Sequence, residues 1–172
     1  MKRMTAMMSA AAVVLTTTMA FAQAKPNFAG TWTRADAPGA AAPAGGQGGG
    51  RGGGGRGGFG MEVAITQDAN TITMKWMQGG GQGTPTEQTR TYKLDGTESK
   101  NSVMGRGGQP ADQVSKAAWE GSKLVISTTT QAGETKQTLS MTGADLTVEQ
   151  SGGQGRDGAP NPTTTVTYKK KA

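Results

Sequence analysis

Acid–base or metal chemistry in this chain would have to use carboxylates, lysines, arginines and tyrosines, because the 172-residue sequence contains no histidine and no cysteine. Imidazole triads and thiolate zinc sites are therefore excluded. The carboxylates, such as Asp68, Asp95 and Asp145, fall mostly in predicted turns or on the outward side of predicted strands. Nucleophile elbows, phosphate-binding loops and metal-ligand clusters are absent from the sequence. We expect a protein that is not an enzyme and that uses no cofactor.

Six aromatic and methionine side chains are the best candidates for binding a ligand. They share the inward side of the predicted strands, and aromatic and methionine side chains offer adaptable apolar contact to a small molecule. The set is Met74, Trp76, Tyr92, Trp119, Met141 and Tyr168. The same residues could instead form a packed core with no room for a ligand, and the sequence leaves both interpretations open.

Residues 1–24 have the features of a cleaved secretion signal. Lys2 and Arg3 precede a short apolar stretch at 10–20, and Ala22-Gln23-Ala24 offers the small-x-small site at which signal peptides are cut. The apolar stretch is too short, and too interrupted by threonines, to span a bilayer. The sequence therefore predicts a periplasmic or secreted protein whose single domain is 25–172, with no membrane-spanning segment after cleavage.

Four arginines, Arg51, Arg56, Arg106 and Arg156, lie in glycine-rich segments. The first two belong to Arg-Gly-Gly sequences, which resemble segments that bind RNA through stacking and charge. Because an exported chain does not meet cellular RNA, we expect no nucleic-acid partner. Two interpretations are left: solvated loops, or a positively charged mouth that favours anionic ligands or surfaces.

The segment from Ala117 to Val148 determines the predicted architecture. Apolar residues fall on every second position, and glycine-containing turns at 120–123, 131–134 and 142–145 interrupt the alternation. A period of two with turns between the runs is typical of an antiparallel meander with one apolar face. The same pattern occurs earlier in the chain, at 61–65 and 72–76, and a last strand carries Val166 and Tyr168.

Low-complexity glycine-rich tracts separate several of these strands. The longest, 35–60, is predicted to be a flexible loop, because such a composition cannot bury enough surface to offset its chain entropy. Successive connections of a meander alternate between the two ends of the sheet, so the long connections are all expected at one end. About 8–10 strands predict an all-β, up-and-down barrel. The few large inward residues would not fill such a barrel, which favours a ligand-binding interior.

The sequence Phe28-Ala29-Gly30-Thr31-Trp32 resembles the first strand of the calycin group, which includes lipocalins and fatty-acid-binding proteins. The resemblance implies a lipocalin-like barrel in which Gly30 and Trp32 form a structural plug at the closed end, as in small exported bacterial proteins of this type. The sequence departs from the family in three ways. Its first connection cannot form a helical lid; Val166 stands where fatty-acid-binding proteins carry an arginine two residues before Tyr168; and no arginine faces the tryptophan from the last strands.

The sequence predicts that this protein binds a small hydrophobic or amphipathic ligand inside the barrel. The alternative is an envelope or extracellular interaction protein that uses its glycine- and arginine-rich loops to contact an anionic surface or partner. The sequence does not determine the oligomeric state.

Overall fold

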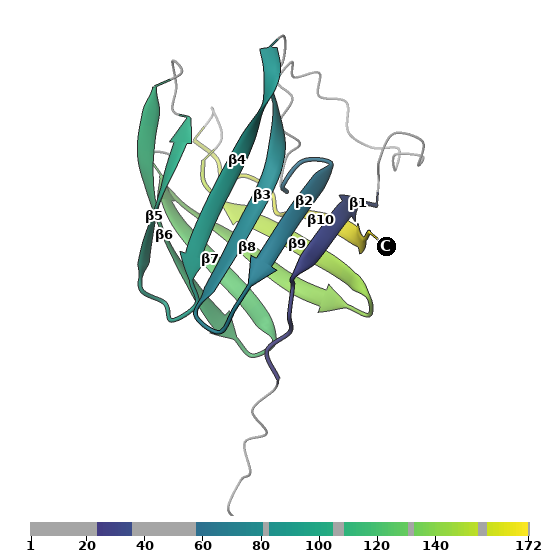
Figure 1. The fold of residues 1–172 in the computed structure, drawn as a ribbon. Helices are drawn as coiled ribbons and strands as arrows, with labels where there is room; N and C mark the ends of the chain where they lie inside the picture. The colour runs from purple at the N-terminus through teal and green to yellow at the C-terminus, as the bar shows by residue number, and fades with distance from the viewer. Residues whose placement is uncertain are drawn as a thin grey trace, which may run out of the picture.

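The computed structural model describes residues 24–35, 58–80, 83–104, 109–130, 133–154 and 158–171 (Figure 1). These residues form ten β-strands and no helix. The strands are β1 (Gly30–Arg34), β2 (Glu62–Gln67), β3 (Thr71–Gly80), β4 (Gly83–Lys93), β5 (Glu98–Met104), β6 (Pro110–Glu120), β7 (Lys123–Thr130), β8 (Gly133–Thr142), β9 (Asp145–Gly152) and β10 (Thr164–Lys170).

The ten strands form one antiparallel sheet in the order β4-β3-β2-β1-β10-β9-β8-β7-β6-β5. The last strand returns to the first, with Trp32 opposite Lys170 and Arg34 opposite Tyr168. Since β4 and β5 are also consecutive in the chain and lie in contact, the sheet curls into a nearly closed barrel. The predicted all-β, up-and-down barrel is confirmed. One connection is shorter than expected, because β3 and β4 extend through Gly80 and Gly83 and leave two residues between them.

The connections divide between two ends of the barrel. The closed end carries the tight turns at 68–70, 94–97, 121–122 and 143–144, which lie at the bottom of Figure 1. The open end carries the other five connections, including the three longest, 35–61, 105–109 and 153–163. In the turns at the closed end, Asp68 accepts hydrogen bonds from the backbone of Asn70 and from the hydroxyl and backbone of Thr71, and Asp95 accepts bonds from the hydroxyl and the backbone of Thr97. These bonds hold the pKa of each of the two carboxyls below its usual value.

Side chains, rather than a regular backbone ladder, join β4 to β5. Asn101 accepts a 2.8 Å hydrogen bond from Thr91 N and donates a 3.1 Å bond to Thr91 O. Ser99 accepts a 2.9 Å bond from Lys93 N. Asn101 and Ser99 are themselves buried, so the barrel is closed at this seam by polar side chains that replace missing backbone partners.

Replacing Asn101 with alanine is expected to lower the free energy of unfolding by about 2 kcal/mol, because two hydrogen bonds to Thr91 are lost at about 1 kcal/mol each. Urea unfolding followed by circular dichroism measures the change. Ser102 is the matched control, since it is the next residue of β5 and is exposed. Ser102→Ala should change stability by less than about 0.5 kcal/mol. Equal effects of the two substitutions would show that the seam contributes nothing.

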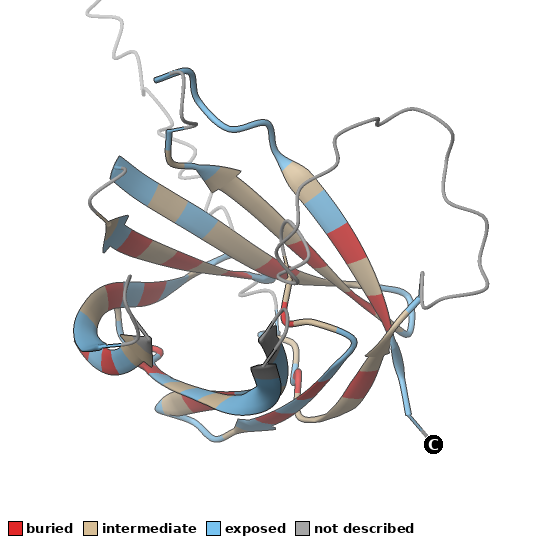
Figure 2. Ribbon diagram, turned by 90° about the horizontal axis from the view of Figure 1, so that it is seen from above, coloured by how far each residue is buried: buried red, intermediate tan, exposed pale blue. Residues whose placement is uncertain are grey.

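Buried and exposed residues alternate along the strands (Figure 2). The inward positions nearest the closed end are apolar and fully buried, among them Ile72, Leu124, Ile126, Leu139 and Leu146. β-Branched and leucine side chains pack well on a pleated surface, which is why these segments form strands. The apolar core therefore occupies the closed half of the barrel.

Aromatic residues seal the closed end. Phe28 stacks on Trp119 with ring centroids 5.8 Å apart, and its carbonyl accepts a 2.8 Å hydrogen bond from Trp32 Nε1. Lys170 faces Trp32, with Nζ 5.6 Å from the centre of the indole ring. Gly30 has φ of +141°, and a Cβ there would lie 2.8 Å from Lys170 Cε. The glycine therefore leaves space for a cation–π contact.

Candidate ligand-binding site

The side chains that line the inside of the barrel differ in polarity between its two ends. Beyond the closed-end core, most inward positions of β4 to β10 carry amides, hydroxyls and one guanidinium, and Val103 and Ala111 are aliphatic exceptions. The polar residues are Gln88, Arg90, Asn101, Gln113, Ser115, Thr128, Thr135, Gln137, Gln150 and Thr164. Most of them are half-buried, so solvent or a ligand reaches them. The open half thus presents a polar inner surface above an apolar core.

Cross-strand pairing makes this polar surface continuous. Asn101 lies opposite Gln113, and Gln137 lies opposite Gln150. Ser115 and Thr128 are buried, and their hydroxyls share a 2.8 Å hydrogen bond. The polar residues are thus neighbours around the wall and form one surface.

Arg90 is the charged group of the polar inner surface. Its guanidinium carbon lies 5.3 Å from the centre of the Trp76 ring, a cation–π arrangement. Its Nε is buried and has no hydrogen-bond partner, and the same is true of Gln113 Oε1. A donor on β4 and an acceptor on β6 thus remain unsatisfied. Between these strands lies Asn101 of β5, whose side chain bonds Thr91 of β4 and whose backbone pairs with Gln113 of β6. Buried polar groups without a partner are costly in a folded protein.

Tyr92 lies next to Arg90 on the inward side of β4. Burial raises the pKa of its hydroxyl, while the charge and hydrogen bond of Arg90 lower it in part. The phenol therefore stays protonated at neutral pH and offers Arg90 no phenolate partner.

Phe59 lies in the interior, although the sequence assigned it to the flexible loop 35–60. Its ring is 2% exposed and packs against Trp76 and Tyr168, with centroid distances of 5.3 Å and 6.4 Å. Tyr168 Oη accepts a 2.7 Å hydrogen bond from Phe59 N and donates a 3.2 Å bond to Gly60 O. The prediction failed here because a single aromatic residue among glycines gives no periodic signal, yet burying its ring is favourable.

The six predicted ligand-binding residues are distributed over three environments. Met74, Tyr92 and Tyr168 are fully buried members of the core. Trp119 and Met141 pack against the core beside closed-end turns, and Trp119 stacks on Phe28 there. Trp76 alone among the six lies in the open half, between Phe59 and Arg90. Ligand contact by any of the six stays a prediction.

Several predicted features lie outside the described residues. Arg51, Arg56, Arg106 and Arg156 all do, and so does the signal segment 1–23. The positively charged mouth therefore stays a prediction.

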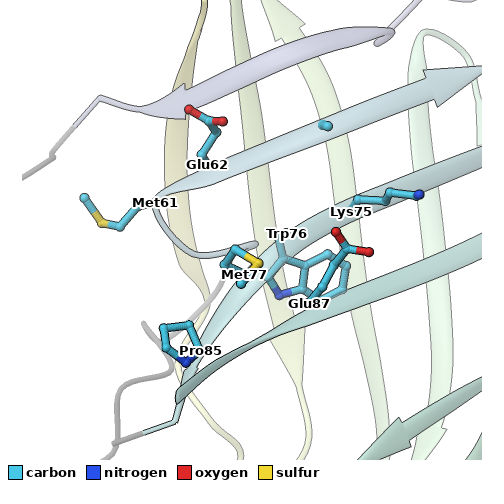
Figure 3. A pocket seen from close by; sticks show the side chains of 8 residues that line it. Met61, Glu62, Lys75, Trp76, Met77, Pro85 and Glu87 are labelled. Atoms are coloured by element: carbon cyan, nitrogen blue, oxygen red, sulfur yellow. The ribbon is translucent and has the colours of Figure 1, made fainter. Parts of the chain in front are cut away.

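A groove of about 440 Å³ lies along β2, β3 and β4, and Trp76 lines it together with outward residues of these strands such as Ala64 and Glu87 (Figure 3). Its lining includes the exposed Met61 and Met77 beside three charged residues, Glu62, Lys75 and Glu87. Across the described residues, no three potential metal ligands gather. In the same part of the chain, no helix has the length and hydropathy to cross a membrane.

No protein-family model and no curated protein matches the chain. Among solved structures it is similar to a mutant of the fluorescent protein UnaG, with 20% identity and a TM-score of 0.46 over 64% of this chain and 71% of that one. It is also similar to the REP1-NXSQ fatty acid transporter, with 10% identity and a TM-score of 0.45 over 64% and 70% of the two chains. These likenesses are weak, and the fold assignment rests on strand order and register. Membership of the calycin group stays a prediction.

Sequence reasoning missed the polar inner surface, although the signal was present. Gln113 and Ser115 share the parity of Ala117 and Trp119, and Thr128 shares that of Ile126. The apolar residues of each alternating run end where the polar inward positions begin. A search for apolar residues alone therefore misses the polar ones. Extending the same parity toward the open end would have found them.

Proposed function

We propose that this chain is a non-enzymatic binding protein that holds a small amphipathic molecule reversibly in the open half of the barrel. One observation carries the proposal: the half-buried polar inner surface adjoins the ring of Trp76, above a core that is already packed. An amphipathic ligand matches such a surface, because its apolar part can contact the indole while its polar part meets amides and hydroxyls.

Export to the periplasm or the extracellular space is part of the proposal. It is supported by the composition of 1–24, with Lys2 and Arg3 before an apolar stretch and Ala22-Gln23-Ala24 at its end.

Native mass spectrometry of protein purified gently from its natural source tests the proposed function. We expect the mass of the protein plus one small molecule. Calorimetric titration of the ligand-free protein with dodecanol, dodecanoate, anilinonaphthalene sulfonate and para-hydroxycinnamate then measures binding directly. A clean ligand-free mass together with no heat from any of the four probes would refute the proposal.

Two tryptophans provide a matched pair for locating the ligand. Trp76→Leu should weaken the binding of an aromatic probe roughly tenfold, because the ring contact in the open half is lost. Trp119→Leu should leave the affinity unchanged, since Trp119 stacks on Phe28 at the closed end. The reverse order of effects would place the ligand elsewhere.

A further inference from the structure

Arg90 brings a positive charge into the interior, and none of the described residues forms an ion pair with it. The three ion pairs between described residues join Lys116 to Glu98, Lys169 to Asp145 and Lys171 to Glu62, and all six side chains are exposed or partly exposed. Arg90 belongs to none of them, and its guanidinium faces an indole ring and a neutral phenol.

The carboxylates of the described strands all lie on the outward side. On β4 to β6, Glu87, Glu98 and Asp112 each precede an inward residue in the chain, namely Gln88, Ser99 and Gln113. By the same alternation, the other carboxylates of the described strands lie on the outward side. They are Glu62, Glu120, Glu134, Asp145 and Glu149. The inner surface near Arg90 is therefore positive, and it attracts anions without an internal competitor.

The groups around Arg90 also limit the chemistry of the rest of the ligand. Gln113 Oε1 is a buried acceptor with no partner, and Asn101 and Gln88 lie close by on the neighbouring strand positions. An alkyl chain would leave Gln113 Oε1 unsatisfied, whereas a hydroxyl or amide donor on a ligand would pair with it.

We propose that the open half of the barrel binds a polar organic anion, whose charged group pairs with Arg90 and whose hydrogen-bond donor reaches Gln113. The body of this ligand lies against Trp76. This inference rests on the proposed function and narrows its ligand class from amphipathic molecules in general to hydroxylated or amide-bearing organic anions, as distinct from simple fatty acids.

Calorimetric titration of the full chain with para-hydroxycinnamate and its neutral primary amide tests the proposal, because the two probes share a body and differ in charge. The carboxylate should bind at least about tenfold more tightly, the typical difference made by one hydrogen bond to a charged group. It should also bind more tightly than dodecanoate, which lacks donors for Gln113.

Substitutions at Arg90 test whether this residue causes the preference for the carboxylate over the amide. Arg90→Gln should reduce carboxylate affinity to that of the amide, and Arg90→Lys should retain part of the preference because the charge is kept. Lys93→Gln is the matched control: it removes one positive charge from the outward, exposed side of the same strand, and it should leave the preference intact.

Equal binding of the carboxylate and the amide to the unmodified protein would overturn the proposal, whether or not the variants fold. Tighter binding of dodecanoate, or an undiminished preference in Arg90→Gln, would also overturn it. Binding of dodecanol alone would refute the anion inference while leaving the proposed binding function intact.

Discussion

Replacing Trp32 with alanine is expected to lower the free energy of unfolding by about 3–5 kcal/mol, the usual range for removing a large aromatic side chain from a core. Trp32 is 1% exposed and donates a 2.8 Å hydrogen bond to the carbonyl of Phe28. Its loss removes the ring contact with Lys170 as well, and it frees the segment that holds Phe28 against Trp119. Urea unfolding measures the change through the midpoint and slope of the transition.

Two further variants separate the causes of this loss. Trp32→Phe keeps most of the ring volume and removes the indole donor, so it should cost clearly less than alanine. Met77→Ala is the surface control, because that side chain is 54% exposed, and it should cost less than about 0.5 kcal/mol. A cost for Trp32→Ala as small as that of Met77→Ala would show that the closed end is held together by other contacts.

Phe59→Ala is expected to cost about 3 kcal/mol of stability, because a ring that is 2% exposed leaves its contacts with Trp76 and Tyr168. The same change should shift the tryptophan emission of the native protein to longer wavelength, since water reaches the indole of Trp76 once the covering ring is gone. Urea unfolding and the emission spectrum of the folded state measure the two effects.

Met61→Ala is the control for Phe59, because it lies two residues along the chain and is 46% exposed. It should leave both stability and emission nearly unchanged. If Phe59→Ala behaved like Met61→Ala, the ring would contribute nothing to the inner wall, and the segment 58–60 would have to be regarded as part of the loop.

The fold could be predicted from the sequence because its signal is periodic and local. Apolar residues at every second position and glycine-containing turns specify strands, and a meander of strands that curls on itself needs no further information. The closure between β4 and β5 could not be predicted. It depends on Asn101 and Ser99, ordinary polar residues whose importance comes only from the backbone groups that face them across the seam.

The site was less predictable than the fold, for a related reason. The apolar residues chosen as ligand contacts share the inward parity with the core, and parity alone does not distinguish packing from lining. The burial of each side chain does: Met74 and Tyr168 are inside the packed cluster, whereas Arg90 and Gln113 are half-buried on the same inward side. Similarly, Lys170 could be matched to Trp32 only once the register of β1 and β10 was known.

The most direct test of this account uses the three tryptophans as internal reporters of position. Their indole N–H signals are followed by nitrogen-edited NMR while para-hydroxycinnamate is added to the protein. We predict that the Trp76 signal shifts in proportion to bound ligand, while the signals of Trp32 and Trp119 at the closed end stay in place. A shift of Trp32 or Trp119 without one at Trp76, or no shift at all, would contradict a binding site in the open half of the barrel.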